Sequence, residues 1–449
     1  MPPCNLFNRM VDNRIVERYL CSTEWLTTES LNKGEAMRSS TGRWVSGGDF
    51  FNRERELQIL ETRVRDYNHV LLTGQRRMGK TSVTQELGRR LEAEGWVFLF
   101  ADVEGATCAE DAIADIAQAA HSVRPIMSRF ATTMKRLVGS VEEIGAHDFR
   151  VKLRAGLNAG NWRRHGEELL QHCAAHEQPV LLVIDELPIL LKRMLDDDDG
   201  ARQADEFLSW LRRVLQALGD SSPVLIVSGS IGLAPLVKRL GIPDRINHLD
   251  PFRLGPWDRN TSIECFQRLS ESCGLRVEDG VAEAVYDALG VGIPHHVQSF
   301  FARLRDHATM QSQEQVTVED IGEVYRTELL GPSGQNDLVH YETRLKEALE
   351  DESHTIAMEI LAEAATQEVF TPSARRCLER LYAKVVDDAP DRIADTLEIL
   401  MHDGYLEAID GGHRFPSRLL KDWWSARFRD HHRPLKGRRS EAESPGDAP

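Results

Sequence analysis

The 449-residue sequence contains no long apolar run, and none of its stretches approaches the roughly 18 residues of a membrane-spanning helix. The first residues, MPPCNLFNRMVDNRIVERYL, lack the continuous apolar stretch of a signal peptide. Cysteines are few and odd in number, seven in total, and no two form a CxxC pair. These absences disfavour an integral membrane or secreted protein, a disulfide framework and a zinc site, and we expect a cytoplasmic protein.

Basic charge is also in deficit, with 55 Lys and Arg against 71 Asp and Glu and a net charge of −16. This balance disfavours a protein that coats nucleic acid over its whole surface, although it is compatible with a local basic patch. At this length we expect about two to four domains.

Apolar segments of strand length alternate with helical patterns from residue 48 to residue 255. Helices are predicted between them, including one whose apolar positions from Phe207 to Leu218 keep a 3.6-residue spacing. Residues 105–160 look like an insertion, which includes an alternating stretch at 149–153. Apolar strands separated by helices indicate a parallel sheet covered on both faces, and thus an α/β core. The predicted strands are 69–73, 96–102, 179–185, 223–228 and 246–249.

The strands stop after Pro256, and residues 256–332 are predicted to be a helical region whose last helix opens with a capping box at Thr317. Gly331-Pro-Ser-Gly334 indicates a linker. Residues 338–428 combine three helices with two short strands around Asp410-Gly-Gly412, the elements of a winged helix. We expect 1–47 to be a poorly ordered N-terminal extension, with Met37 as an alternative start, and 429–449 to be a disordered tail.

A GxxxxGKT motif lies between the first predicted strand and the helix that follows it. Its glycines let backbone N–H groups curl around a phosphate, and the helix N-terminus adds its dipole. The lysine of such a motif reaches the β- and γ-phosphates, and the threonine hydroxyl ligates Mg²⁺. The sequence therefore predicts a loop that binds a nucleoside triphosphate, formed by Gly74, Gln75, Arg76, Arg77, Met78, Gly79, Lys80, Thr81 and Ser82.

An acidic pair, Asp185 and Glu186, follows the apolar strand Val180–Ile184. Ligands of open α/β sheets lie at this carboxyl edge. We expect Asp185 to hold Mg²⁺ together with Thr81, and Glu186 to polarise the attacking water for phosphoryl transfer. Ser228, at the end of the next strand, is a candidate sensor of the γ-phosphate, with a plain strand-end cap as the alternative.

The sequence alone does not decide the roles of several other charged residues. Arg239 and Arg245 are candidates for an arginine finger by position, but surface arginines are abundant. The run Asp196–Asp199 is interpreted as a solvated loop before the next helix rather than a metal site.

These motifs, taken together, resemble the AAA+-related archaeal-type ATPases that are grouped with the STAND signalling NTPases. The resemblance covers about residues 48–428 and includes the closing segment Arg414–Trp424 of a winged helix. It is carried by an FxxRExEL-like box at 51–57, GQRRMGKTS at 74–82, LLVIDELPIL at 181–190, SGSIGL at 228–233 and Gly292-Ile-Pro294.

The resemblance implies a P-loop ATPase core over 48–255, a helical lid over 256–332 and a winged helix that responds to the nucleotide, with ATP and Mg²⁺ as cofactors. By position, Arg53 would contact the adenine and Pro294 the base or ribose. His295 or His296 would touch phosphate, with an ordinary helix surface as the alternative. No lid arginine matches the γ-phosphate sensor of many AAA+ proteins, which favours slow hydrolysis.

The predicted recognition helix, 390–402, disfavours DNA as its ligand. Together with its approach it carries five acidic residues against the single base Arg392, and duplex DNA would repel it. A basic segment at 427–439 is the alternative contact, without sequence readout. The acidic residues are Asp387, Asp388, Asp391, Asp395 and Glu398.

Three functional hypotheses follow. The preferred one is a slow, ATP-hydrolysing switch that repositions the winged helix for an unidentified protein partner, with a nucleotide-dependent homo-oligomer as one possible form. The alternative is a DNA-binding AAA+ ATPase of the origin-recognition or transposition-helper type. The third is a nucleotide-stabilised scaffold without turnover.

Overall fold

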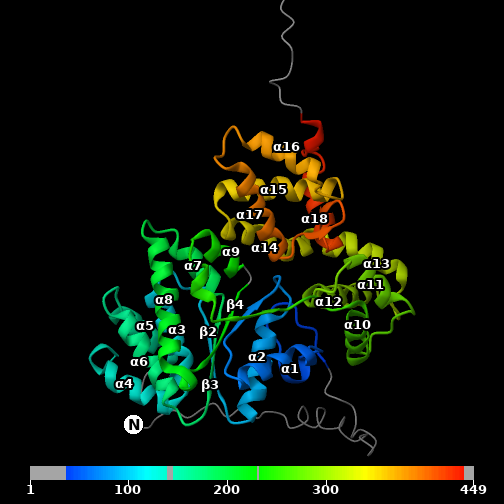
Figure 1. The fold of residues 1–449 in the computed structure, drawn as a ribbon. Helices are drawn as coiled ribbons and strands as arrows, with labels where there is room; N and C mark the ends of the chain where they lie inside the picture. The colour runs from blue at the N-terminus through cyan, green and yellow to red at the C-terminus, as the bar shows by residue number, and fades with distance from the viewer. Residues whose placement is uncertain (1–36, 139–144, 230–231, 439–449) are drawn as a thin grey trace, which may run out of the picture.

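The structure is a computed structural model that describes residues 37–138, 145–229 and 232–438. The expectations for residues 1–36 and 439–449 lie outside the described residues. Figure 1 shows a central sheet with helices on both sides and two further groups of helices beside and above it. Among the described residues, no helix combines the length and apolarity needed to cross a membrane.

The sheet has five strands in the order β2-β3-β4-β1-β5, and all four pairings are parallel. The prediction of a strand at 246–249 is wrong, since Ile246 ends a short 3-10 helix and the edge strand begins at Asp250. That strand is largely exposed and contains Pro251, which an edge strand tolerates. The strands are β1 (Val70–Thr73), β2 (Val97–Asp102), β3 (Val180–Asp185), β4 (Val224–Ser228) and β5 (Asp250–Arg253).

The side chains of the strands alternate between two hydrophobic cores, one on each face of the sheet. Val70 and Leu72 of β1 pack with α1 (Glu54–Arg65) and α2 (Lys80–Ala93), whereas Leu71 packs with the remaining core helices. This confirms a parallel sheet covered on both faces. The remaining core helices are α3 (Ala109–Ala119), α4 (Arg124–Val138), α5 (Ala146–Gly156), α6 (Trp162–Ala174), α7 (Leu187–Met194), α8 (Gly200–Leu218) and α9 (Leu233–Arg239).

The alternating stretch at 149–153 belongs to a helix, α5. Phe149 and Leu153 are buried and Val151 is exposed, so the pattern that alternates every second residue also repeats at the i, i+4 spacing of one helix face. A further helix, α7, directly follows Glu186 and was not predicted separately from α8.

The lid and the C-terminal region share one continuous hydrophobic core. The predicted linker at 331–334 is wrong, because Gly331 is the N-cap of α14 (Pro332–Ala348) and Pro332 is its first residue, a position that suits proline. The capping box at Thr317 and Asp320 is confirmed. The lid helices are α10 (Arg259–Cys273), α11 (Val281–Leu289), α12 (Pro294–Met310) and α13 (Val318–Val324), the last extended by a π-helical turn (Tyr325–Leu329).

The C-terminal region has the element order of a winged helix, with three helices before an antiparallel hairpin. Its tail is not disordered up to residue 438, contrary to the prediction for 429–449. The Leu435 side chain is fully buried, and Glu363 accepts hydrogen bonds from the Leu435 N–H at 3.0 Å and from His432 at 2.7 Å. The elements are α15 (Asp351–Thr366), α16 (Pro372–Tyr382), α17 (Ala389–His402), β6 (Glu407–Ile409), β7 (Gly412–Arg414) and α18 (Arg418–Phe428).

Residues 37–47, which we call the N-terminal strap, are also ordered, contrary to the predicted poorly ordered extension. The Met37 N–H donates to Ser272 of the lid at 3.2 Å, and its side chain is buried. The Gly47 N–H donates to Glu86 of α2 at 2.9 Å. The strap therefore connects the lid to the α/β core.

Short 3-10 helices connect several of these elements. They are Gly47–Asp49, Ala120–Ser122, Gly219–Ser221, Pro243–Ile246 and Leu435–Gly437.

Candidate functional site

The glycine-rich loop between β1 and α2 has the conformation of a phosphate-binding loop. Gly79 is the N-cap of α2 with φ +87°, in the left-handed region that glycine adopts at no steric cost. The α2 N-terminus therefore presents its free N–H groups at the end of the loop, which is a site for an anion. Lys80, the first residue of α2, is buried, and its ammonium donates to the carbonyls of Gly74 at 2.8 Å and Gln75 at 3.2 Å.

The expected magnesium ligands are in contact beside this loop. The Thr81 hydroxyl donates to Asp185 Oδ2 at 2.8 Å, and the Ser228 hydroxyl donates to Asp185 Oδ1. Asp185 and Ser228 are both buried at the carboxyl ends of adjacent strands. A hydroxyl and a carboxylate held together in this way are the hard oxygen donors that Mg²⁺ prefers, so these residues fit the ion.

Glu186 follows at the point where β3 turns into α7. Its φ of +58° is unusual for a residue other than glycine, and its N–H donates to Asp185 Oδ1 at 3.1 Å. Glu186 lines the cavity described next. Lys80, Arg76 and Arg344 all interact electrostatically with its carboxylate.

A cavity of about 720 Å³ opens above the phosphate loop. The core, the lid, α14 and the N-terminal strap each contribute to its wall. Five cationic side chains and three acidic ones line it, so its charge is net positive in a protein of net charge −16. The cations are Arg43, Arg76, Arg77, Lys80 and Arg344, and the acids are Glu104, Glu186 and Asp337.

Arg344 is one of the cavity residues that the sequence patterns did not indicate. It lies on α14, is largely buried, and forms ion pairs with Glu104 and, at 3.0 Å, with Glu347. Burial lowers the pKa of Arg344, but Glu186, Glu104 and Glu347 raise it by more, so the net pKa is raised. The guanidinium is therefore a fixed positive charge near Glu186.

His295 is held in its neutral form at the lid side of the cavity. Burial, together with the nearby charges of Arg77 and Arg76, lowers the pKa of His295 to about 3. Its neutral Nε2 accepts a hydrogen bond from the Arg77 guanidinium, which also donates to Asp337 Oδ1 at 3.2 Å. His296, by contrast, is buried beside the Tyr341 hydroxyl at 3.3 Å, so neither histidine lies on an ordinary helix surface.

The end of α17 packs against the phosphate loop from the C-terminal region. A Cβ atom built on Gly404 would lie 2.8 Å from the Gln75 side chain. Asp403, buried beside it, accepts a hydrogen bond from His402 Nδ1 at 3.0 Å and interacts electrostatically with Lys80. Burial raises the pKa of Asp403, whereas His402 and Lys80 lower it.

The predicted phosphate-loop residues differ in what they contact: some supply carbonyls to Lys80, one is buried in the core, and the others line the cavity. Gly74 and Gln75 supply carbonyls to Lys80, and the Met78 side chain is buried in a sheet core. Ser82 accepts a hydrogen bond from the Val45 N–H of the strap at 3.1 Å. The residues that line the cavity are Arg76, Arg77, Gly79, Lys80, Thr81 and Ser82, and from the lid Pro294.

Arg53 lies outside the cavity wall. Its buried guanidinium donates to the carbonyls of Gly255 at 2.7 Å and Met78 at 3.5 Å, and it pairs with Glu56. These contacts tie the phosphate loop to the chain that enters the lid. They give Arg53 a structural function, and the adenine contact stays a prediction.

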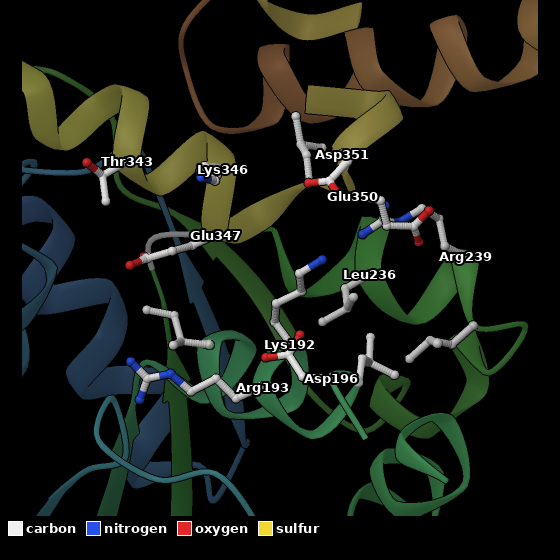
Figure 2. A pocket seen from close by; sticks show the side chains of 14 residues that line it. Lys192, Arg193, Asp196, Leu236, Arg239, Thr343, Lys346, Glu347, Glu350 and Asp351 are labelled. Carbon is white, nitrogen blue, oxygen red and sulfur yellow. The ribbon is translucent and has the colours of Figure 1, made fainter. Parts of the chain in front are cut away.

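The two finger candidates also lie away from this cavity. Arg245 is paired with Asp205 at 2.6 Å. Arg239 lines a different cleft, of about 700 Å³, between α7, α9 and the junction of α14 with α15 (Figure 2). Their finger roles stay predictions. The four aspartates from 196 to 199 are exposed in the turn between α7 and α8, as predicted.

Comparisons with known proteins bear on the fold. No protein-family model and no curated protein matches the sequence. A Walker-type ATPase of Pyrococcus abyssi is similar in structure, with 18% identity, a TM-score of 0.56, and coverage of 86% of this chain and 99% of that one. The ORC2 protein of Aeropyrum pernix, solved as ADPNP–ADP complexes, has 16% identity, a TM-score of 0.51, and coverage of 84% and 96%.

At these identities the likeness concerns the fold. The chain shares the fold of these two proteins, an α/β P-loop core built on a five-stranded parallel sheet, and the predicted fold class is confirmed. Its C-terminal region has the element order of a winged helix.

Proposed function

We propose that this protein is a cytoplasmic switch that binds ATP with Mg²⁺, hydrolyses it slowly, and uses the nucleotide state to move its lid and C-terminal region. The observation that carries the proposal is the packing of α17 on the phosphate loop. Gly404 covers Gln75, and Asp403 interacts with Lys80. The loop that would hold the phosphates is thus the same loop that holds the C-terminal region.

The residues at the site support the binding of a triphosphate. The ammonium of Lys80 is buried among backbone carbonyls, and phosphate oxygens are stronger acceptors for it. Thr81 and Asp185, which are joined by a hydrogen bond, would hold Mg²⁺, and the ion would neutralise charge on the phosphates. Glu186 lines the cavity as the candidate acceptor of a proton from water. The ADPNP–ADP complexes of the ORC2 protein support adenine as the base.

The link between the nucleotide and movement of the C-terminal region follows from which parts of the chain form the cavity wall. Pro294, His295, Asp337 and Arg344 belong to the body formed by the lid and C-terminal region, which shares one core. The phosphate loop and Glu186 belong to the other body. A ligand shifts the equilibrium between two arrangements of these bodies only if it binds one arrangement more strongly than the other. A terminal phosphate that contacts groups of both bodies would do so.

Arg344 supports slow turnover. Its guanidinium is already paired with Glu104 and Glu347, so contact with a phosphate requires an exchange of ion-pair partners. We propose Arg344 as the cationic group at the phosphate end of the cavity.

The charges of the C-terminal region support a protein partner over DNA. Arg392, the single Lys or Arg of α17, is already paired with Glu350 at the start of α15 at 3.2 Å. Among the described residues, only one acid of α17, Glu398, is paired with a lysine, Lys238 of α9, at 2.7 Å. In the basic segment, Arg427 and Arg438 are paired with Glu342 and Glu359. The charge that this segment offers to phosphates is therefore reduced.

The alternative, an ATPase of the origin-recognition type, is favoured by the fold shared with the ORC2 protein. It has a direct test that keeps the fold intact. Arg433 and Lys436 are exposed, and their replacement by Gln leaves the buried Leu435 anchor in place. Salt-dependent DNA binding that the double variant loses would support this alternative, and no DNA binding at low salt would remove it.

The main test compares wild type, Lys80→Ala, Glu186→Gln and the control Lys152→Ala, which changes an exposed lysine on α5. We expect Lys80→Ala to lose ATP binding in calorimetry, and Glu186→Gln to bind ATP but release no phosphate. Lys152→Ala should match wild type. Limited proteolysis and molecular mass in ATP, ADP and no nucleotide then report the switch and any oligomer.

Two outcomes would refute parts of the proposal. Identical protease patterns in all three nucleotide states, in a protein that binds ATP, would contradict the switch. Bound nucleotide without any phosphate release would leave the scaffold without turnover.

A further inference from the structure

The N-terminal strap crosses from the lid to the α/β core along the wall of the cavity. On the lid side the Ser40 N–H donates to Gln298 at 2.8 Å, and on the core side the Val45 N–H donates to Ser82 at 3.1 Å. Ser82 directly follows Thr81, so this hydrogen bond places the strap beside the phosphate loop. The segment between the two anchors, Ser40 to Val45, lines the cavity.

Trp44 is the unusual residue of this segment. Its relative exposure is 50%, whereas the tryptophans at 162, 210, 257, 423 and 424 are at most 6% exposed. A tryptophan side chain is usually well covered in a folded protein. Trp44 lines both this cavity and a second one, of about 380 Å³, that the strap forms, so its ring has exposed surface that a ligand can cover. Trp44 is also the one tryptophan, tyrosine or phenylalanine among the described residues that line the cavity.

The character of the cavity wall changes between its two groups of residues. The phosphate loop, Glu186 and Arg344 supply charge, whereas the apolar surface comes from Trp44 and Val45 of the strap, beside the cation Arg43, and from Pro294 of the lid. A nucleotide has the same division, a charged triphosphate and a flat aromatic base. Arg53, the base contact expected from the sequence, is engaged with the carbonyls of Gly255 and Met78 instead.

We infer that the N-terminal strap forms the base-binding wall of the nucleotide site and that Trp44 stacks on the purine. Base stacking on an aromatic side chain contributes enough to change affinity roughly 5- to 150-fold. The backbone N–H groups of residues 41–44 donate no hydrogen bond within the described part of the chain, so they are available to the polar edge of the base.

This inference rests on the proposed function, and the test separates the two. Binding of Mg·ATP and of inorganic tripolyphosphate is measured by calorimetry for wild type, Trp44→Ala, Trp44→Phe and Tyr67→Ala. Tyr67 is an aromatic of nearly equal exposure, 48%, in the turn after α1 and outside the cavity wall. The melting temperature of each variant is measured alongside.

We expect Trp44→Ala to weaken ATP binding roughly 5- to 150-fold and to leave tripolyphosphate binding within about twofold. Trp44→Phe, which keeps an aromatic plane, should recover most of the affinity, and Tyr67→Ala should match wild type. ATP should also quench the tryptophan emission of wild type more than that of Trp44→Phe.

Three results would overturn the inference. If wild type binds ATP and Trp44→Ala binds it equally well, Trp44 does not stack on the base, and the proposed function is unaffected. An equal loss of ATP and tripolyphosphate would assign the strap to the phosphate site or to folding. If wild type binds neither ligand, the proposed function fails and the inference falls with it.

Discussion

The contact between α17 and the phosphate loop can be tested by one added methyl group. Gly404 has φ +78°, and a Cβ atom there would lie 2.8 Å from the Gln75 side-chain carboxamide and 3.0 Å from the Gln75 Cβ. Gln75 is itself 5% exposed, so it has little space to withdraw. The substitution Gly404→Ala therefore presses the C-terminal region against the phosphate loop.

The free-energy cost of Gly404→Ala has two parts, backbone strain and a steric clash, and a second glycine in the chain provides a control that separates them. An alanine in the left-handed region costs about 1–2 kcal/mol of strain. Overpacking against a buried neighbour adds about 1–3 kcal/mol. Gly411, in the turn of the hairpin, has φ +94° and no atom within 4 Å of an added Cβ, so Gly411→Ala has the strain without the clash. The difference between the variants is the clash, worth roughly 5- to 150-fold in an equilibrium constant.

The assay is the dissociation rate of a fluorescent ATP analogue, with limited proteolysis as a second measurement. Gly404→Ala should release nucleotide at least about fivefold faster than Gly411→Ala and be cleaved faster between the lid–C-terminal body and the core. This follows because one wall of the site is held by the contact that the methyl group disrupts. Equal release rates and cleavage in the two variants would show that α17 does not control the phosphate loop.

Two further predictions concern charges in the cavity. The pKa of His295 is about 3, against about 6.5 in an unfolded chain, so the unfolded state binds a proton that the folded state does not, and stability falls as the pH falls from 6.5 towards 3. At pH 5 the free energy of unfolding is lowered by roughly 2 kcal/mol. The melting temperature of His295→Gln should therefore fall less between pH 7 and pH 5 than that of wild type or of the exposed-site control His431→Gln. Equal falls in the three proteins would contradict a neutral, buried His295. Arg344→Ala should lower the rate of ATP hydrolysis by about 10²–10³-fold with a small change in melting temperature, because its partner Glu104 is 45% exposed. The control Arg427→Ala removes an ion pair to Glu342 of α14, the helix that also carries Arg344, and should leave the rate unchanged. Equal hydrolysis rates for the two variants would show that Arg344 does not act on the phosphates.

The errors of the sequence interpretation have a common cause. The edge strand β5 lacks the apolar run of a buried strand because only one side of it pairs within the sheet. The tail up to residue 438 is polar in composition, yet one buried leucine and one buried carboxylate hold it. Gly331 and Pro332 have the composition of a linker, but the same two residues also suit a helix start. In each case the composition is ambiguous and the tertiary contact decides.

Local patterns predicted most of the element order, the phosphate loop between β1 and α2, the acidic pair at the end of β3 and the hairpin, because strand and helix periodicity and the glycine-rich motif are properties of neighbouring residues. Arg344, Trp44 and the Gly404 contact come from segments that lie far from residues 74–82 in the chain and carry no motif. Their place around the phosphate loop was set only when the lid, α14 and α17 packed into one core beside the sheet, because burial of apolar side chains brings distant segments together without leaving a local signature.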